Sequence, residues 1–377
     1  MNTRTAQLGE RARALSRTFG RWFPTPSILS PQSAGIDISD SSVKWLVLAP
    51  FKDTHRVVSW GDTPLPPDVV VGGVIQDVEA LADTLAEVKR NLGGISFAHA
   101  ALPEEAAYVF TMHVPEGTPR DQVLRMIEFE FEGRVPITPA TAVYDFDVIL
   151  KHDDGEGEEI GVSVFPRDLA ESYVAAFDMA GITLISLEVE ARSIARAVSS
   201  GQEDEPITLL VDFGRARTGF AVLKRSVPIF TSTVEVGGDG ITKALVEKLS
   251  MTAEEAEAFR NEKGLQVESG DSSEAVQVAM GTAAALADEV TRHFHYWDTR
   301  RNERGDRMTP VGQVLFVGGS ANLSGLTDYI AARVQAPTAR ANVWRHICDF
   351  DEYIPPIDCR RSLQFATAIG LALRTLP

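Results

Sequence analysis

Residues 35–48 read GIDISDSSVKWLVL, which predicts an apolar strand, a short polar turn and a second apolar strand. A carboxylate, Asp37, stands inside the first strand, just before the serine-rich turn. Residues 209–223, LLVDFGRARTGFAVL, repeat this arrangement, with Asp212 in the place of Asp37. The sequence therefore predicts two α/β lobes, each opened by a strand, a turn preceded by an aspartate, and a second strand.

Turns of this kind are suited to binding phosphate. Backbone amides in a tight turn converge on an anion, and the hydroxyl groups of Ser39, Ser41 and Ser42 add further donors. A carboxylate at the end of a strand holds Mg²⁺ directly or through water. One turn alone is explained as well by an aspartate that caps it, whereas two turns facing each other across a cleft predict a nucleoside triphosphate site.

Two glycine pairs follow the second turn. Gly237 and Gly238 precede a predicted helix, a geometry that suits an anion at the helix N-terminus. Gly318 and Gly319, followed by Ser320, come after the apolar strand VLFV and let a nucleoside lie flat against the backbone. Each pair alone is ordinarily a turn. The order of two aspartate turns and two glycine pairs is more specific than any one of them.

Composition and charge narrow the class of protein. The chain has 377 residues, 44% of them hydrophobic and 24% charged, as in a globular protein of two or three domains or two large lobes. It has no run of about 18 apolar residues that would predict a transmembrane helix. Its two cysteines, Cys348 and Cys359, favour neither a disulfide framework nor a metal site, so a reducing compartment is expected.

The formal net charge is −17, although residues 1–33 carry five arginines and one glutamate. An acidic body repels phosphate and argues against nucleic acid as the main ligand. It suits a basic peptide, and solubility alone also explains it. In the N-terminal extension, helical spacing of apolar residues among the arginines predicts an amphipathic helix that binds a membrane surface or a partner, or else a disordered tail; these residues are Leu8, Ala12, Leu15, Phe19 and Trp22.

The remaining chain divides into segments. Residues 34–200 are expected to form the first lobe, 201–361 the second, and 362–377 a closing helix that returns to the first lobe. A strand-helix-strand-strand unit within about 96–166 interrupts the first lobe. This order predicts an α/β fold of two lobes with a small inserted α+β subdomain.

The whole pattern resembles the actin/Hsp70/sugar-kinase ATPase fold, which is ribonuclease H-like, and within it the PilM family of type IV pilus assembly. The match extends over 34–377. GIDISDSSVK is similar to the family opening GIDIGSSSVK, and PRDQVLRMIEFEFEGRVPITPATAVYDFDVI to its inserted SHS2 domain. VDFGRARTGFAVL, VLFVGGSANLSGL and AIGLALR resemble its second phosphate turn, adenosine loop and closing helix. The cell-division protein FtsA shares this layout.

The resemblance implies an ATP and Mg²⁺ site. Asp37 and Asp212 would organise the metal, most simply through water. The groups near the phosphates would be Ser39, Ser41, Ser42, Lys44, Gly214, Thr218, Gly237 and Gly238. The groups around the ribose and base would be Glu257, Arg260, Gly318, Gly319 and Ser320. Glu188 or Glu190 would orient the attacking water.

Three positions depart from the family pattern. Ser39 stands where glycine is expected, and a positive φ there would strain it. Asp40 places a negative charge near the phosphates. Its carboxylate must therefore point away from them or bind the metal, because otherwise it would repel the phosphates and prevent nucleotide binding. Arg215 replaces a small residue and either reaches phosphate or pairs with Asp40 across an empty cleft. A degenerate, nucleotide-free pocket therefore stays open.

By the same resemblance, the protein would be a cytoplasmic, peripherally membrane-associated scaffold. It would bind the short cytoplasmic peptide of an inner-membrane pilus-assembly protein beside the inserted subdomain and would hydrolyse ATP slowly at most. The alternatives are a small-molecule kinase, for which the sequence offers no convincing catalytic aspartate, and a membrane-tethered, polymer-forming cytoskeletal protein. Whether the chain forms homo-oligomers stays open.

Overall fold

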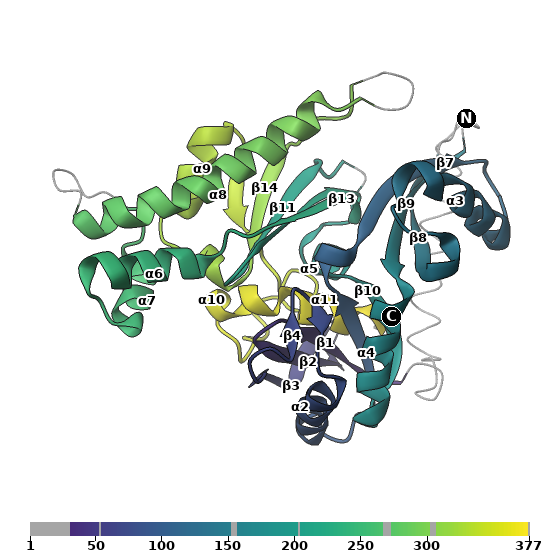
Figure 1. The fold of residues 1–377 in the computed structure, drawn as a ribbon, viewed down its shortest axis with the longest axis horizontal. Coiled ribbons are helices and arrows are strands. Elements are labelled where there is room, and N and C mark those ends of the chain that lie inside the picture. Colours follow the sequence, from purple (N-terminus) through teal and green to yellow (C-terminus); the bar gives the residue numbers. More distant parts are fainter. Residues whose placement is uncertain are drawn as a thin grey trace.

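The computed structural model describes residues 31–52, 54–151, 157–202, 204–266, 273–301 and 307–375. The predicted amphipathic helix of the N-terminal extension lies outside these residues. Within them, two five-stranded sheets and a three-stranded sheet carry the helices, and the two larger sheets belong to different lobes (Figure 1). No helix in the described ranges is both long and apolar enough to cross a membrane.

The first lobe is built on a mixed sheet with helices on both faces. Its strand order is β10-β6-β1-β2-β3, with β1 antiparallel to β2 and parallel to β6. Helices α2 and α4 pack together over one face, and α5 and α11 cover the other. The bounds are β1 Ser33–Ile38, β2 Ser42–Phe51, β3 Thr54–Pro64, β6 Phe97–Leu102, β10 Thr183–Val189, α2 Val78–Asn91, α4 Arg167–Met179, α5 Glu190–Val198 and α11 Ala366–Ala372.

Glycines allow the closing helix α11 to lie directly on β1 and α5. A Cβ atom at Gly35 would stand 2.1 Å from the carbonyl oxygen of Ala368. A Cβ atom at Gly370 would stand 1.8 Å from the carbonyl oxygen of Ser193. Backbone therefore packs against backbone on both sides of the helix, and the last segment of the chain is held against the strand that leads to Asp37.

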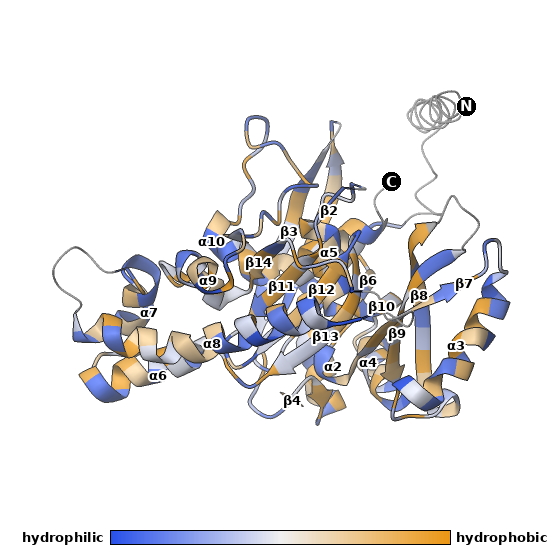
Figure 2. Cartoon of the chain, turned by 90° about the horizontal axis from the view of Figure 1, so that it is seen from above, coloured by the Kyte–Doolittle hydropathy of each residue, from blue (hydrophilic) through white to orange (hydrophobic). Residues whose placement is uncertain are grey.

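The second lobe repeats this plan. Its strand order is β13-β12-β11-β14-β15, with β11 antiparallel to β12 and parallel to β14. The long helix α8 buries one face against this sheet, while α6 and α7 extend beside it (Figures 1 and 2). The bounds are β11 Thr208–Phe213, β12 Thr218–Lys224, β13 Val227–Val234, β14 Gln313–Val317, β15 Thr338–Arg340, α6 Gly238–Leu249, α7 Ala253–Glu262, α8 Glu274–Thr299, α9 Leu326–Val334 and α10 Cys359–Ser362.

The third sheet, with order β7-β9-β8, packs on helix α3 around its own apolar core. Its elements are β7 Tyr108–Val114, α3 Arg120–Arg134, β8 Ala142–Lys151 and β9 Glu158–Pro166. Strand β6 pairs with β1 and β10 of the first sheet. The prediction that the inserted unit begins near residue 96 was therefore wrong, because the separate sheet begins at Tyr108.

The inserted sheet also packs against the second lobe. Lys224 at the end of β12 donates to the carboxylate of Glu159 on β9 at 2.5 Å, and the Glu159 side chain is only 7% exposed. A Cβ atom at Gly161 would stand 2.6 Å from a side-chain carbon of Val227. The inserted unit thus belongs to the first lobe by sequence and contacts both lobes in space.

Candidate functional site

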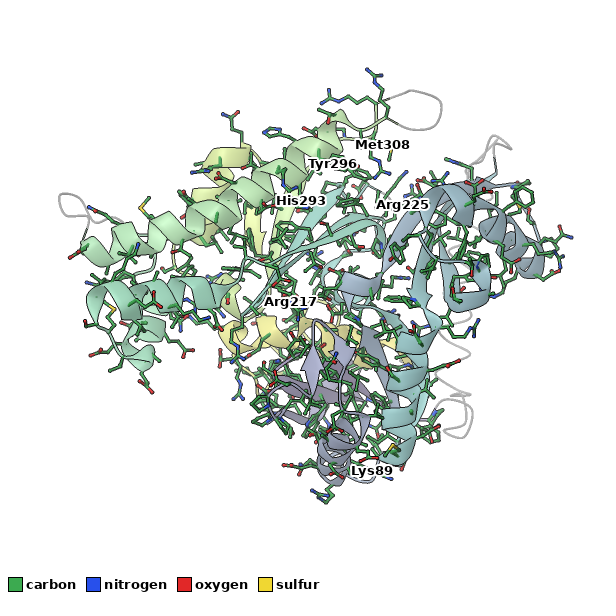
Figure 3. The ribbon with its side chains drawn as sticks, in the orientation of Figure 1. Lys89, Arg217, Arg225, His293, Tyr296 and Met308 are labelled. Atoms are coloured by element: carbon green, nitrogen blue, oxygen red, sulfur yellow. The ribbon has the colours of Figure 1, made fainter. Side chains whose placement is uncertain are left out.

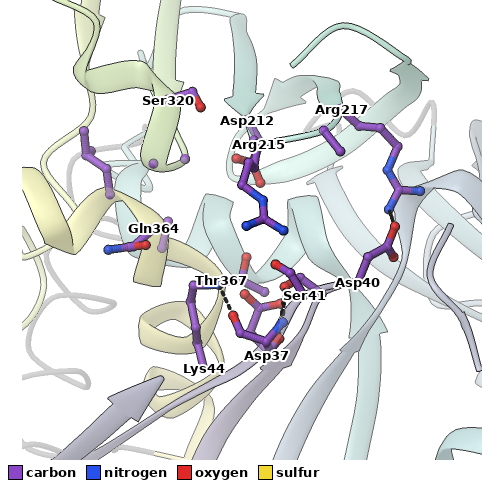
Figure 4. A pocket seen from close by; sticks show the side chains of 18 of the residues that line it. Asp37, Asp40, Ser41, Lys44, Asp212, Arg215, Arg217, Ser320, Gln364 and Thr367 are labelled. Carbon is purple, nitrogen blue, oxygen red and sulfur yellow. Dashed lines mark hydrogen bonds and ion pairs between the residues drawn. The ribbon is translucent and has the colours of Figure 1, made fainter. Parts of the chain in front are cut away.

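A cleft of about 1110 Å³ lies between the lobes and is lined by residues from both. The turn after β1 and the turn after β11 form two of its walls, as the sequence predicted. Figure 4 shows Asp37, Ser41 and Lys44 on the side of the first lobe, and Asp212, Arg215 and Ser320 opposite them. Helix α7, the loop after β14 and the segment from Asp358 to Thr367 complete the lining.

The first turn is closed by its own serines. The Ser39 amide donates to the carbonyl oxygen of Ser42 at 3.0 Å, and the Ser39 hydroxyl donates to the same oxygen at 3.0 Å. Ser39 does not have a positive φ, so a side chain fits where the family pattern has glycine. Lys44 donates to the Ser42 hydroxyl at 3.0 Å, which places its ammonium group in the cleft.

The Asp40 carboxylate is fixed by other groups. It accepts hydrogen bonds from the amides of Gly72 and Gly73 at 3.1 and 3.0 Å, and it pairs with the Arg217 guanidinium (Figure 4). Of the two alternatives for Arg215, the pairing with Asp40 is contradicted, because Arg217 takes that role. Arg215 lies 3.7 Å from Asp239 and points into the cleft (Figure 4). The negative charge of Asp40 is therefore neutralised at the side of the site.

The Asp212 side chain, at the second turn, lies against the backbone of the loop that follows β14. The Gly214 amide donates to the carbonyl oxygens of Asp212 and Arg217, at 3.1 and 3.0 Å. Gly318, at a φ of +87°, lies so close that a Cβ atom there would stand 2.4 Å from Asp212 Oδ1. The left-handed backbone and the close approach both require glycine at this position. The glycine loop after β14 thereby shapes the surroundings of the aspartate.

Burial changes the acidity of both aspartates. It raises the pKa of Asp37 to about 6, while nearby Lys44 opposes this shift and Asp62 adds to it. Burial together with the negative charge of Asp37 raises the pKa of Asp212 to about 7. Each carboxylate is thus held in a protein environment that favours its neutral form, and a bound cation would favour the charged form.

Two more carboxylates line the cleft and were missed by sequence reasoning. They are Glu104 and Glu105 of the short helix η1, Glu104–Ala106. Glu104 is 8% exposed, and its Oε1 has no hydrogen-bond partner. Burial and the charge of Asp212 raise its pKa well above the usual value. The signal was present, since η1 follows β6, and the carboxyl ends of the parallel strands β1 and β6 meet at one edge.

The two glutamates proposed to orient water have different surroundings. Glu190 lines the cleft, and burial with the charge of Glu105 raises its pKa well above the usual value. Glu188 is outside the lining, and its carboxylate accepts two hydrogen bonds from Arg196, at 2.6 and 2.7 Å, and one from Arg374. Of these two alternatives, Glu188 is contradicted, because its carboxylate lies in a buried ion pair outside the cleft lining.

The start of helix α6 offers less than the sequence predicted. The amides of Gly238 and Asp239 donate to the carbonyl oxygens of Gly214 and Arg215, at 3.1 and 2.8 Å, so neither is available to an anion. A Cβ atom at Gly237 would stand 2.3 Å from the Arg215 carbonyl oxygen. The glycines therefore seat the helix against the second turn. Thr218 is fully buried, and its hydroxyl donates to the Val236 carbonyl oxygen at 2.5 Å, outside the cleft lining.

Helix α7 and the loop after β14 both contribute to the cleft lining. Glu257 and Arg260 come from α7, and Gly319 and Ser320 come from the loop. Arg260 donates to the Thr242 hydroxyl at 2.8 Å, its Nε has no partner, and burial lowers its pKa. Arg360 and Arg361, which sequence reasoning did not select, add two positive charges to the lining.

Comparisons with known proteins agree on the fold. The family model described as "Type IV pilus assembly protein PilM" matches residues 35–376. The solved PilM-PilN type IV pilus biogenesis complex is 19% identical, with a TM-score of 0.73, over 92% of this chain and 99% of that chain. MreB 5 of Spiroplasma citri bound to AMPPNP is 13% identical, with a TM-score of 0.51, over 90% of this chain and 94% of that chain.

Two cell division proteins are also similar in sequence. FtsA of Staphylococcus epidermidis is 23% identical over 351 residues, which cover 80% of this chain and 73% of that protein. FtsA of Streptococcus pneumoniae is 21% identical over 174 residues, and the match spans 43% of this chain and only 38% of that protein. The two-lobed architecture is that of actin-like ATPases.

Proposed function

The chain belongs to the family of the type IV pilus assembly protein PilM, and from this membership we propose that it is an ATP-binding scaffold of a pilus or related secretion machine. Nucleotide binds between the two lobes and contacts both, and any hydrolysis is slow. The observation that carries the proposal is the placement of Asp37 and Asp212, from opposite lobes, in one cleft of about 1110 Å³. A cleft of this size accommodates a nucleotide.

The phosphate end of the site is proposed to lie between the two turns. Ser41 and Lys44 supply donors from the first lobe, and Arg215 supplies a positive charge from the second. Mg²⁺ fits the oxygen donors of Asp37 and Asp212, although no group of three potential protein ligands is placed to hold a metal among the described residues. Mg²⁺ keeps several waters, so two carboxylates acting through water satisfy it. Its positive charge would also reduce the repulsion among the carboxylates that line the cleft.

The nucleoside end is proposed to lie between Arg260 and the loop of Gly319 and Ser320, with Glu257 near the ribose. Gly214 and Gly318 give the phosphates and the Asp212 carboxylate room to approach the backbone. Gly237 and Gly238 act indirectly, by seating α6 against the second turn. Glu190 is the remaining candidate for orienting a water molecule.

The partner is proposed to be the basic cytoplasmic peptide of an inner-membrane pilus-assembly protein. The net charge of −17 favours a basic peptide, and the similar PilM structure was solved in a complex with PilN. The binding groove would lie beside the inserted sheet β7-β9-β8. The protein would then associate with the membrane through its partner.

Calorimetric titration with MgATP tests the nucleotide claim. We expect saturable binding by the wild type and at least about a tenfold loss of affinity in Asp212→Ala, because about 1.4 kcal/mol corresponds to tenfold. Asp288→Ala is the matched control, since this aspartate is 72% exposed and pairs with Arg333 on the surface. Absence of saturable binding by the wild type would refute the nucleotide claim. A peptide pull-down tests the scaffold claim separately.

The similarity to FtsA favours one alternative, a membrane-tethered protein that forms polymers. Sedimentation of the full chain with MgATP, with and without anionic liposomes, separates the two functions. Pelleting that depends on protein concentration supports the polymer, whereas a monomer that binds the peptide supports the scaffold.

A further inference from the structure

Arg217 connects the two lobes at the side of the cleft. It leaves the second lobe just before β12 (Figure 3). Its guanidinium forks between two carboxylates of the first lobe, one of which is Asp40 (Figure 4). One nitrogen pairs with Asp40 of the first turn, and the other lies 2.9 Å from Glu105 after β6. The Arg217 side chain is only 17% exposed, so water screens these ion pairs less than those of a surface arginine.

The first lobe holds the acceptors in place from behind. Asp40 also accepts the amides of Gly72 and Gly73, which form the turn between β4 Val70–Val71 and β5 Val74–Ile75. Tyr173 of α4 donates to the Gly73 carbonyl oxygen at 2.9 Å. The Asp40 acceptor of Arg217 is thus held in place by hydrogen bonds that link the first turn, the β4–β5 turn and α4. Residues of both lobes therefore contribute to the contact.

Arg215 provides the natural contrast. It lies in the same turn and carries the same charge, but its side chain is 67% exposed and its ion pair, with Asp239, is within the second lobe. It crosses to no carboxylate of the first lobe in any ion pair formed by the described residues. Only one of the two arginines therefore joins the phosphate turns.

We propose that Arg217 is a clasp that holds the lobes closed without nucleotide, so that the spacing of the two phosphate turns is set by the Arg217 ion pairs with Asp40 and Glu105. This inference rests on the proposed function only in taking the cleft to be the nucleotide site. Because the Arg217 ion pairs already fix the distance between the two turns, MgATP binds in a cleft that is already closed. Its binding therefore changes the relative position of the lobes little. The scaffold surface then keeps one shape with and without nucleotide.

Distances between spin labels on the two lobes test the clasp. Labels go on Glu87→Cys of α2 and Glu254→Cys of α7, both exposed, in the full chain with Cys348→Ala and Cys359→Ser. Without nucleotide, we expect a single narrow distance in the wild-type background and no shift with MgATP. Arg217→Gln should lengthen and broaden the distance, and the matched control Arg215→Gln should leave it unchanged. Glu105→Gln removes one arm and should give an intermediate shift.

Arg217→Lys guards against a variant that fails to fold, because a lysine keeps the charge but cannot fork between two carboxylates. It should also lengthen the distance while circular dichroism stays that of the wild type. A narrow, unshifted distance in Arg217→Gln, or an equal opening in Arg215→Gln, would overturn the clasp. Since the wild type and the variants are compared without nucleotide, that comparison stands whether or not the wild type binds MgATP, so the clasp and the nucleotide site can fail independently.

Discussion

Asp37 and Asp212 end strands of two different sheets, and the negative charge of Asp37 adds to burial in raising the pKa of Asp212 to about 7. The raised pKa of Asp212 thus arises in part from a carboxylate of the other lobe, whereas the charges that shift the pKa of Asp37 are Lys44 and Asp62 of its own lobe. The protonation of Asp212 therefore reports on the closed cleft and on any cation that enters it.

The raised pKa of Asp212 predicts how stability depends on pH. Since the carboxyl group binds its proton more tightly when folded than when unfolded, its contribution is present in full below about pH 4 and is lost as pH rises through about 7. Asp212→Asn should flatten this dependence and stabilise the nucleotide-free protein at about pH 8, by on the order of 1–3 kcal/mol. Urea unfolding of both proteins between about pH 5 and pH 8 measures the difference.

The difference between the two proteins matters because other groups titrate in the same range. A wild type and an Asp212→Asn variant that lose stability in parallel would show that Asp212 is not held neutral. Added Mg²⁺ offers a further check. If it stabilises the wild type at about pH 8 more than the variant, the carboxylate contributes to cation binding.

The contact between Gly35 and α11 predicts a large effect for a small change. Gly35→Ala should lower the free energy of unfolding by about 3 kcal/mol, because its methyl group would meet the Ala368 carbonyl oxygen. Gly281→Ala is the control, since Gly281 is an exposed position of α8 with no atom within 4 Å of its added Cβ. It should stabilise the protein by about 0.5–1 kcal/mol. Urea unfolding compares them, and equal effects would contradict the close packing of α11.

Glu188 and Glu190 should respond differently to the same substitution. Glu188→Gln removes the charge that pairs with Arg196 and Arg374, and a broken buried pair costs about 3 kcal/mol. Glu190→Gln should cost little at neutral pH, because burial and neighbouring carboxylates already favour its neutral form. Urea unfolding at about pH 7 measures both. Equal losses would mean that Glu190 also has a structural charge partner.

Much of the fold was predictable because its signals are local. An aspartate turn between two apolar strands, found twice, identified both halves, and the glycine pairs marked where helices and loops approach the site. The boundary of the insertion was not predictable in this way. Strands β6 and β7 are both largely apolar and are separated by a short segment, yet long-range pairing places them in different sheets.

The site was predictable in outline and not in its ion pairs. The sequence indicates that arginines enter the second turn, but the turn geometry decides that Arg217, and not Arg215, reaches Asp40. Glu188 and Glu190 differ by two positions at the end of β10, where the chain passes from strand to helix and one side chain leaves the cleft. Glu104 was missed because part of what raises its pKa, the charge of Asp212, comes from the other lobe.

The last prediction concerns the attachment of the inserted sheet to the second lobe. Lys224→Met should lower the free energy of unfolding by about 3 kcal/mol, because it leaves the nearly buried Glu159 carboxylate without its partner. Arg120→Met is the matched control. Arg120 and Asp145 form an ion pair at 2.6 Å, but both side chains are more than half exposed, so its loss should change stability by no more than about 0.5 kcal/mol.

Hydrogen exchange locates the effect of Lys224→Met. If Lys224 fastens the insertion, amides of β7, β8 and β9 lose protection in Lys224→Met while those of α8 keep it. The amides of β7, β8 and β9 should exchange more slowly in Glu159→Gln than in Lys224→Met, because a neutral amide can be buried at lower cost than an unpaired carboxylate. Protection lost evenly over both lobes would show instead that the ion pair supports the whole fold. The contrast between an exposed and a buried bridge of similar length would then reflect global stability, with no separate attachment of the inserted sheet.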